Sequence, residues 1–276
     1  MKVIWFNGNF GNQIFYCAYK DYLNEKYPKE RIFAYIDPKC PPVLVEERTN
    51  LLMPNTSSLV TILSFFVFKV LGVIFRRIPA KYVPKWYCGK DRLDDHAMFI
   101  EHSMQSKSFY EEKESSWLEI RNNASLSSDY LAFEKQIKEC DAICIHIRRG
   151  DYVKPGSLYA NLADSDYYEK AIQQARIKYP QGKLFFFSDD LEYVKGRFKD
   201  EEASYVNCNS GKDGYLDIKL MSLAKVNIIA NSTFSYWGAY IGHENKFVFY
   251  PKRWFTAESG RVAPDIMLNK SNWIGI

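Results

Sequence analysis

The sequence predicts an α/β protein built on parallel β-sheet. Apolar, strand-like runs alternate with segments of helical spacing, most regularly from residue 129 onward, and this alternation is typical of parallel strands covered by helices. The 276 residues are enough for about two domains. Apolar residues make up 47% of the chain, which excludes global disorder.

The N-terminal region begins as a strand, a turn and a helix. Residues 2–6 (KVIWF) predict a strand, 7–12 (NGNFGN) a turn, 13–27 a helix, and 31–36 a second strand. The turn lacks the G-x-G-x-x-G spacing of a dinucleotide site. It either serves only to start the helix or lies against an acceptor or phosphate group through Asn9, Gly11, Asn12 and Gln13.

An apolar segment at residues 59–75 raises the question of membrane contact. Lys69 interrupts it, and it falls short of the about 20 apolar residues that a spanning helix needs. We favour a buried or domain-packing helix. A helix lying on the inner membrane surface stays open, because basic residues follow at Arg76, Arg77, Lys81 and Lys85.

The second half of the chain has the most regular pattern. We predict helices over 130–139, 166–178, 215–226 and 233–244, and strands over 142–147, 183–188, 204–208, 227–231 and 246–251. We place an N-terminal domain at residues 1–139 and a C-terminal domain at residues 140–276. In parallel sheets ligands bind at the carboxyl ends of the strands.

Polar side chains follow three of these predicted strands. Because the carboxyl ends of parallel strands share one edge of the sheet, these residues are expected to gather there. Arginine can grip phosphate with two hydrogen bonds, a helix start attracts anions, and a carboxylate can accept hydrogen bonds from a guanine edge. The pattern predicts a site for a guanine nucleoside diphosphate made from Arg148, Arg149, Asp151, Ser188, Asp189, Asp190, Asn231, Ser232, Thr233 and Ser235.

Structural explanations compete with this hypothesis. The arginines could form ion pairs with Asp189 and Asp190, and residues 231–235 could serve only as a helix cap. Asp164 and Asp166 form a D-x-D pattern, but they stand where a helix begins, so capping explains them better than a metal ion does. We predict no metal and no cofactor.

Charge and cysteine usage restrict the partners and the compartment. The net charge of +4 comes without a basic block, so no nucleic-acid partner is expected. The six cysteines are scattered without a C-x-x-C pair, and the N-terminus lacks a signal-peptide pattern. We therefore expect a cytoplasmic protein, with peripheral contact to the inner membrane surface left open.

Several motifs resemble those of the bacterial alpha-1,2-fucosyltransferases of glycosyltransferase family 11. The motifs at 146–152 and 217–239 are specific, whereas the one at 187–190 is short. The motifs are NGNFGNQIFYCAY at 7–19, HIRRGDY at 146–152, FSDD at 187–190 and DIKLMSLAKVNIIANSTFSYWGA at 217–239.

The resemblance implies a GT-B-type fold, with two Rossmann-like domains and a cleft between them. The domain at residues 1–139 would bind the acceptor, and the domain at residues 140–276 would bind GDP-fucose. The resemblance also implies inverting, metal-free transfer of L-fucose from GDP-beta-L-fucose to a glycan, with O2 of a terminal galactose as the expected acceptor.

The resemblance further implies roles for single residues. His146 would contact guanine or its ribose, Arg148 would hold the beta-phosphate, and Asp190, with Asp189, would read the guanine edge. The pyrophosphate would lie against Ser232, Thr233 and Ser235. Asp151 is our candidate general base, with fixing an arginine as its alternative role.

Two other functions stay open at the level of sequence. The same fold could use another GDP-sugar, or the protein could bind a nucleotide sugar or glycan without catalysis.

Overall fold

The computed structural model describes residues 1–36, 51–52, 58–78, 81–83, 97–101, 104–110, 126–242, 245–267 and 270–276. The chain forms two compact units, Met1–Asn122 and Asn123–Ile276. The division falls before the expected boundary at residues 139 and 140, because helix α3 (Ser128–Lys138) packs on helix α6 (Leu216–Ser222) of the second unit.

The first unit contains a parallel sheet with the strand order β3-β2-β1-β5-β4. The order is built around the predicted first strand, and the short strands β3 to β5 were not predicted. The strands are β1 (Lys2–Phe6), β2 (Ile32–Ile36), β3 (Leu51–Leu52), β4 (Tyr82–Val83) and β5 (Phe99–Ile100).

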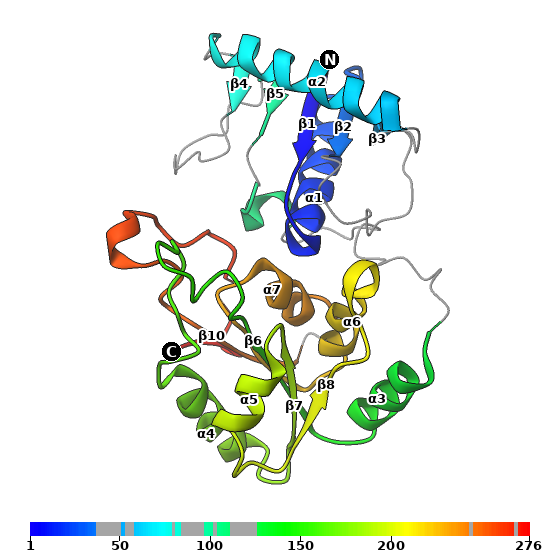
Figure 1. The fold of residues 1–276 in the computed structure, drawn as a ribbon. Coiled ribbons are helices and arrows are strands. Elements are labelled where there is room, and N and C mark those ends of the chain that lie inside the picture. The colour runs from blue at the N-terminus through cyan, green and yellow to red at the C-terminus, as the bar shows by residue number, and fades with distance from the viewer. Residues whose placement is uncertain are drawn as a thin grey trace. The chain divides into compact units, whose positions relative to one another are not determined.

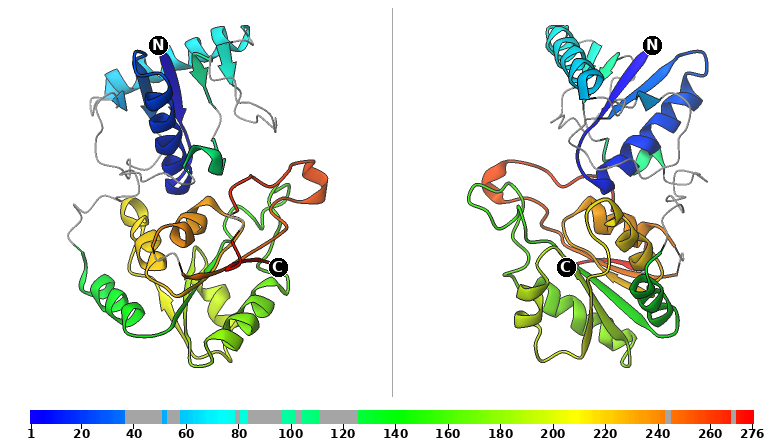
Figure 2. Two further views of the ribbon diagram at one scale, coloured as in Figure 1. Left: turned by 180° about the vertical axis from the view of Figure 1, so that it is seen from behind. Right: turned by 45° about the vertical axis from the view of Figure 1, so that its right-hand side comes forward.

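Helices cover both faces of this sheet (Figure 2). Helix α1 (Phe10–Lys26) contacts β1 and β2, and Tyr16 stacks on Phe6. Helix α2 (Ser58–Arg76) packs on the other face, where Val3, Trp5, Tyr35 and Phe99 form a core cluster. Alternate residues of β1 therefore face opposite helices, as the pleat of a strand requires.

The predicted N-terminal turn is shorter than expected. Helix α1 begins at Phe10, so Gly11, Asn12 and Gln13 are helical and not part of a loop. Gly8 makes the tight turn with a φ of +93°, a conformation that favours glycine. A Cβ at Gly8 would lie 2.6 Å from Nδ2 of Asn12, so a side chain there would have to displace the Asn12 amide.

The second unit contains a six-stranded parallel sheet in the order β11-β10-β9-β6-β7-β8. The chain leaves β6 toward one edge and returns through β9 toward the other, which is the doubly wound Rossmann order. Its strands are β6 (Ala142–Ile147), β7 (Lys183–Ser188), β8 (Ala203–Val206), β9 (Val226–Ile228), β10 (Phe247–Tyr250) and β11 (Trp273–Gly275).

Helices α4 (Tyr167–Lys178), α5 (Leu191–Arg197) and α7 (Thr233–Tyr240) join α3 and α6 around this sheet (Figure 1). On one face, Ile143, Ile145 and Ile147 pack with α4. Short 3-10 helices among the described residues include Lys107–Phe109 in the first unit, and Gly211–Asp213 and Ala257–Ser259 in the second.

The two parallel-sheet units confirm the predicted α/β class with two Rossmann-like domains, the pair that constitutes a GT-B-type fold. Some boundaries differ from the prediction: β9 ends at Ile228, α7 ends at Tyr240, and α5 and β11 were not expected. None of the helices in the described part of the chain is long and apolar enough to span a bilayer.

Candidate functional site

Strands β6 and β9 are neighbours, and the strand order reverses between them. In open α/β sheets this switch point is where ligands bind, outside the carboxyl ends of the strands. Arg148 follows β6 there, and α7 begins at Thr233 a few residues after β9. The structure thus brings together the ends of β6, β7 and β9, as the sequence predicted.

Arg148 stands between two carboxylates. Its Nη2 donates to Oδ1 of Asp151 at 2.7 Å, and its Nη1 lies 2.8 Å from Oδ2 of Asp189. Burial lowers the pKa of this guanidinium, but the two carboxylates outweigh burial, so the pKa lies above its ordinary value. A guanidinium has five N–H donors, so these two partners leave donors for a further anion.

Arg149 is held more completely by the protein itself. Its guanidinium stacks on the Tyr193 ring at 3.5 Å from the centroid, and its Nε donates to Oδ2 of Asp190 at 3.0 Å. Its Nη1 donates to Oδ1 of Asp164 at 3.3 Å. In the structure Arg149 therefore forms ion pairs with protein carboxylates, which was the alternative to phosphate binding.

The two aspartates after β7 both bond to the arginine segment. Oδ1 of Asp189 accepts from the backbone N–H of Arg149 at 2.9 Å, while its Oδ2 faces Arg148. Asp190 is the N-cap of α5 and accepts from the backbone N–H of Tyr193. Ser188 accepts from the N–H of Asp190, so this strand end is held by internal hydrogen bonds.

Gly150 allows the close approach of Asp189. A Cβ at this position would collide with Oδ2 of Asp189, the oxygen that pairs with Arg148. Steric contact with Asp189 therefore explains why a glycine stands in the R-R-G-D segment. The sequence alone did not indicate this contact.

His146 is a buried, neutral imidazole at the end of β6. Burial, together with the nearby Arg148 charge, lowers its pKa to about 3. Its Nδ1 is buried without a hydrogen-bond partner, and its ring lies 5.4 Å from that of Phe234 in α7. A buried polar atom without a partner is costly, and a bound ligand would remove that cost.

The start of α7 has the helix cap that was the alternative to an anion site. Ser232 is the N-cap and accepts from the N–H of Phe234. Ser235 is fully buried, donates to the carbonyl of Ser232 and accepts from the N–H of Ala230. Thr233 is the first helical residue.

Asn231 is buried and joins two loops. Its amide donates to the carbonyls of Ala160 and Trp254 at 3.0 and 2.7 Å. Its own carbonyl accepts from the hydroxyl of Tyr152. These contacts position the loops around the strand ends.

Tyr152 and Tyr159 were not singled out from the sequence. Their rings stack at 4.3 Å, and Tyr159 in turn contacts the ring of Phe255. Tyr152 also lies under Arg148, 5.7 Å from the ring centroid to Cζ. The only signal for this stack was the tyrosine that closes the H-x-R-R-G-D-Y motif.

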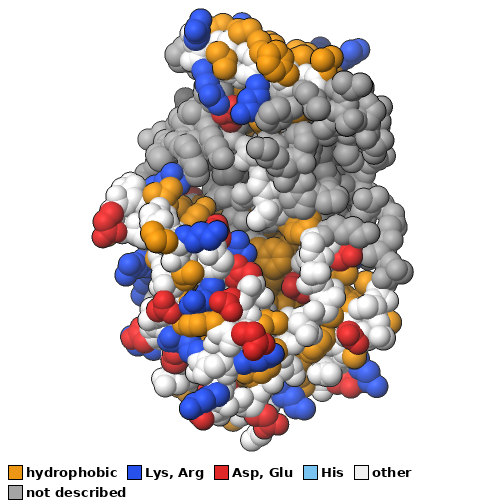
Figure 3. All heavy atoms as spheres, viewed as in Figure 1, with side chains coloured by type: hydrophobic (Ala, Val, Ile, Leu, Met, Phe, Trp, Pro, Cys, Tyr) orange, Lys and Arg blue, Asp and Glu red, His pale blue; other side chains and the backbone are white. Residues whose placement is uncertain are grey.

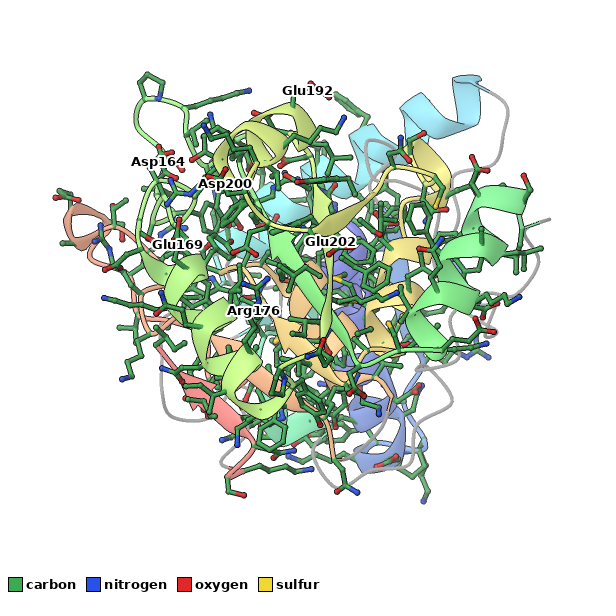
Figure 4. All side chains as sticks on the ribbon, turned by 90° about the horizontal axis from the view of Figure 1, so that it is seen from below. Asp164, Glu169, Arg176, Glu192, Asp200 and Glu202 are labelled. Carbon is green, nitrogen blue, oxygen red and sulfur yellow. The ribbon has the colours of Figure 1, made fainter. Side chains whose placement is uncertain are left out.

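The D-x-D residues have other roles than the predicted caps. Asp166 is the N-cap of α4 by position, but its side chain makes no cap hydrogen bond and pairs with Lys170. Asp164 (Figure 4) accepts from Tyr193 and Asn161 as well as Arg149. The hydrogen bond from Tyr193 is the main cause of its lowered pKa.

Glu169, in the first turn of α4, accepts hydrogen bonds from Nε and Nη2 of Arg197. Among the described residues, no three His, Cys, Asp or Glu side chains gather as a metal site would require. Metal independence stays a prediction.

The N-terminal residues proposed for an acceptor or phosphate loop belong to the first unit. Asn9 is the N-cap of α1 without a side-chain cap bond, and Oδ1 of Asn12 accepts from Nε2 of Gln105 at 3.0 Å. Gly11 and Gln13 are buried inside the helix. A ligand role for these residues stays a prediction.

A scan against protein-family models matches residues 48–276 to the family described as glycosyl transferase family 11. The match covers well over half of the sequence. The chain belongs to glycosyl transferase family 11, as its motifs predicted.

Curated relatives match over part of their length. The O-antigen biosynthesis glycosyltransferase WbnK of Escherichia coli is 35% identical over 52% of this chain and 50% of its own. An alpha-1,2-colitosyltransferase of Escherichia coli is 31% identical over 56% and 55%. A galactoside 2-alpha-L-fucosyltransferase of Mus musculus is 30% identical over 35% and 27%. The chain thus spans about half the length of the first two relatives.

Solved structures with a similar fold are more distant in sequence. The alpha-1,6-fucosyltransferase NodZ, soaked with GDP-fucose, is 15% identical with a TM-score of 0.47, over 87% of this chain and 92% of that one. The ADP-heptose heptosyltransferase II of E. coli is 12% identical with a TM-score of 0.49, over 100% and 90%.

Proposed function

We propose that the protein transfers L-fucose from GDP-beta-L-fucose to O2 of a terminal galactose in a glycan, with inversion and without a metal ion. The observation that carries this proposal is Arg148. It stands at the switch point of a Rossmann-type sheet, oriented by Asp151 and Asp189, with N–H donors left for a phosphate.

The transfer reaction requires a cationic group at the phosphates of the donor. When the bond between fucose C1 and the phosphate oxygen breaks, negative charge develops on GDP. Without a metal, fixed donors must stabilise that charge, and Arg148 with the N-terminus of α7 supplies them. Arg149 fixes the neighbouring carboxylates and Tyr193, which keeps the segment that carries Arg148 in place.

The acceptor hydroxyl attacks C1 from the face opposite GDP and loses its proton. Asp151 is the carboxylate we assign to take that proton, since it is half-exposed and already oriented by Arg148. His146 is neutral and has an unpaired Nδ1, which fits a hydrogen bond to the nucleoside part of the donor.

The named relatives support the sugar and the acceptor class. One is called a galactoside 2-alpha-L-fucosyltransferase and another an O-antigen glycosyltransferase. The relative named as an alpha-1,2-colitosyltransferase supports a second candidate, transfer of colitose from its nucleotide sugar. Competition between donors for turnover separates the two.

Thermal melting in EDTA with GDP, UDP or ADP is the first test. A ligand at about 100 times its Kd stabilises the folded state by about 2.7 kcal/mol, which a melting curve resolves. Of the three nucleotides, we expect only GDP to raise the melting temperature. A shift with UDP alone, or with GDP only after a metal is added, would contradict the metal-free guanine site.

Release of GDP from GDP-fucose, with and without a galactose-terminated acceptor, then tests catalysis. A protein that binds GDP in the melting assay but never releases it from GDP-fucose would be a binding protein instead.

A further inference from the structure

Helix α2 has two apolar faces, one packed against the sheet and one exposed. Toward the sheet it places Phe68, Leu71 and Phe75 against the core cluster of β1, β2 and β5. On the opposite side an outer face is exposed, and it consists of Leu63, Phe66, Val67, Val70, Val73 and Ile74. The spacing of these residues, three and four apart, puts them on one stripe of the helix.

Specific contacts fix which face points outward. Phe68 stacks on Tyr35 at 3.8 Å, and Phe75 stacks on Phe99 at 5.7 Å. At the last turn, Arg76 pairs with both carboxylate oxygens of the buried Glu101 at 3.0 and 3.1 Å. The outer face therefore cannot turn inward without breaking these contacts.

The outer face is exposed to a degree unusual for large apolar side chains. Leu63 is 70% exposed and Phe66 is 67% exposed. Figure 3 shows hydrophobic side chains gathered along α2, with Lys and Arg side chains beside them. A contiguous apolar patch with a polar rim marks an interaction site.

The charged residues that flank α2 in the sequence have one sign. Between Glu47 and Asp91 the sequence contains no acidic residue, whereas Lys or Arg occurs at 48, 69, 76, 77, 81, 85 and 90. Arg77 and Lys81 are exposed beside the helix end. An apolar stripe with a cationic border matches the boundary between acyl chains and anionic headgroups of a bilayer.

We propose that the outer face of α2 binds an anionic phospholipid surface, with the helix lying in the plane of the interface. A second copy of this chain fits less well, because a symmetric contact would bring two identical cationic borders together. The proposal does not depend on the donor or acceptor of the transfer reaction.

Sedimentation with vesicles of phosphatidylcholine, with and without phosphatidylglycerol, tests the proposal. The wild type is expected to sediment with the anionic vesicles and to be released by salt. The double variant Phe66→Glu/Val70→Glu should lose binding, since it puts two carboxylates on the outer face. Its matched control is Leu131→Glu/Ile177→Glu, which changes two exposed apolar residues on α3 and α4 and should bind like the wild type.

A second variant tests the cationic border. Arg77→Gln/Lys81→Gln is expected to bind anionic vesicles about tenfold or more weakly, since each basic residue near the surface contributes about a few-fold or more. All variants should melt like the wild type, because every changed side chain is exposed. Binding of Phe66→Glu/Val70→Glu equal to the wild type would overturn the proposal.

Failure of the wild type to bind any vesicle would also overturn the proposal. A dimer in sedimentation velocity that the Phe66→Glu/Val70→Glu change abolishes, without vesicle binding, would assign the face to a second copy instead. Neither result bears on GDP binding, so the transfer reaction is judged separately.

Discussion

Oδ2 of Asp189 lies 2.8 Å from Nη1 of Arg148, while Oδ1 of the same carboxylate accepts the backbone N–H of Arg149. One side chain from the end of β7 thus holds both the guanidinium and the backbone of the segment after β6. Asp189 is placed to orient Arg148, and this arrangement suggests several direct tests.

Two replacements of Arg148 separate the effect of its positive charge on transfer from the effect of the guanidinium's shape. Arg148→Ala should abolish transfer, and Arg148→Lys should recover little, because an ammonium cannot match the planar, forked guanidinium between two carboxylates. GDP-fucose turnover with circular dichroism as a fold check measures this. Full activity of either variant would remove Arg148 from the phosphate-binding role.

Gly150→Ala is expected to displace Asp189, because the added Cβ would collide with its Oδ2. Arg148 then loses an orienting partner, so GDP affinity should fall although no charge has changed. Titration of GDP by calorimetry measures it. The control is Gly196→Ala in α5, where a Cβ meets nothing within 4 Å. Equal GDP affinity in both variants would show that Asp189 tolerates the displacement.

Asp151→Asn distinguishes a base from an orienting group. Asparagine keeps an oxygen that can accept the hydrogen bond from Arg148, so if Asp151 accepts the proton, kcat should fall by about 10²-fold or more while GDP affinity changes little. If it only fixes Arg148, GDP affinity should fall as well. Steady-state kinetics with GDP titration decides between the two, and an unchanged kcat would exclude the base.

Asp217 makes folding stability depend on pH. Burial raises the pKa of this carboxyl from 3.8 to about 7, although Asn209 donates to its Oδ1 at 2.6 Å and lowers it. Between about pH 4 and pH 7 the folded protein keeps the proton and the unfolded chain loses it, so stability falls as pH rises through this window.

Asp217→Asn removes this dependence. Its melting temperature should exceed that of the wild type at about pH 8, and the difference should shrink near pH 4. Melting curves across this range measure it, and a difference that is constant with pH would contradict the raised pKa.

Lys246 closes the ends of two helices. Its buried Nζ donates to the carbonyls of Ser222, the last residue of α6, and Ile241, the C-cap of α7, at 2.9 and 2.8 Å. Lys246→Met should leave these carbonyls unpaired and lower stability by about 3 kcal/mol. Urea unfolding measures this, with Lys225→Met in an exposed ion pair as the control. Equal losses in the two variants would refute the capping role.

The sequence indicated the sheet and its polar edge because both depend on simple patterns. Alternating apolar runs marked β6 and β7, and their parallel pairing puts Ile147 opposite Ser188, so Arg148 and Asp189 had to meet. The ion pair of Arg149 with Asp190 was one of the alternatives, but no pattern showed that Asp164 and Tyr193 would also contact this guanidinium, since those contacts depend on how the segment before α4 and helix α5 fold.

Other features were hidden for local reasons. Helix α1 starts already at Phe10, because Gly8 makes the turn alone. The sequence did not show this early start, because Gly11 and Asn12 are residue types that are common in loops. The predicted anion ligands Asn231 and Ser235 form hydrogen bonds with backbone groups, and a serine that binds backbone looks the same in sequence as one that binds phosphate.

The pairing of β6 with β7 also bears on how the protein can be altered. His146 lies opposite Phe187 and Ile147 opposite Ser188, so a one-residue deletion inside either strand would turn every following side chain to the other face. It would also shift Arg148 and Asp189 by about 3.3 Å relative to each other along the strands, out of reach of one another. Changes of loop length between residues 154 and 158 leave that alignment intact, so variation in this protein is expected to collect in loops and to avoid these two strands.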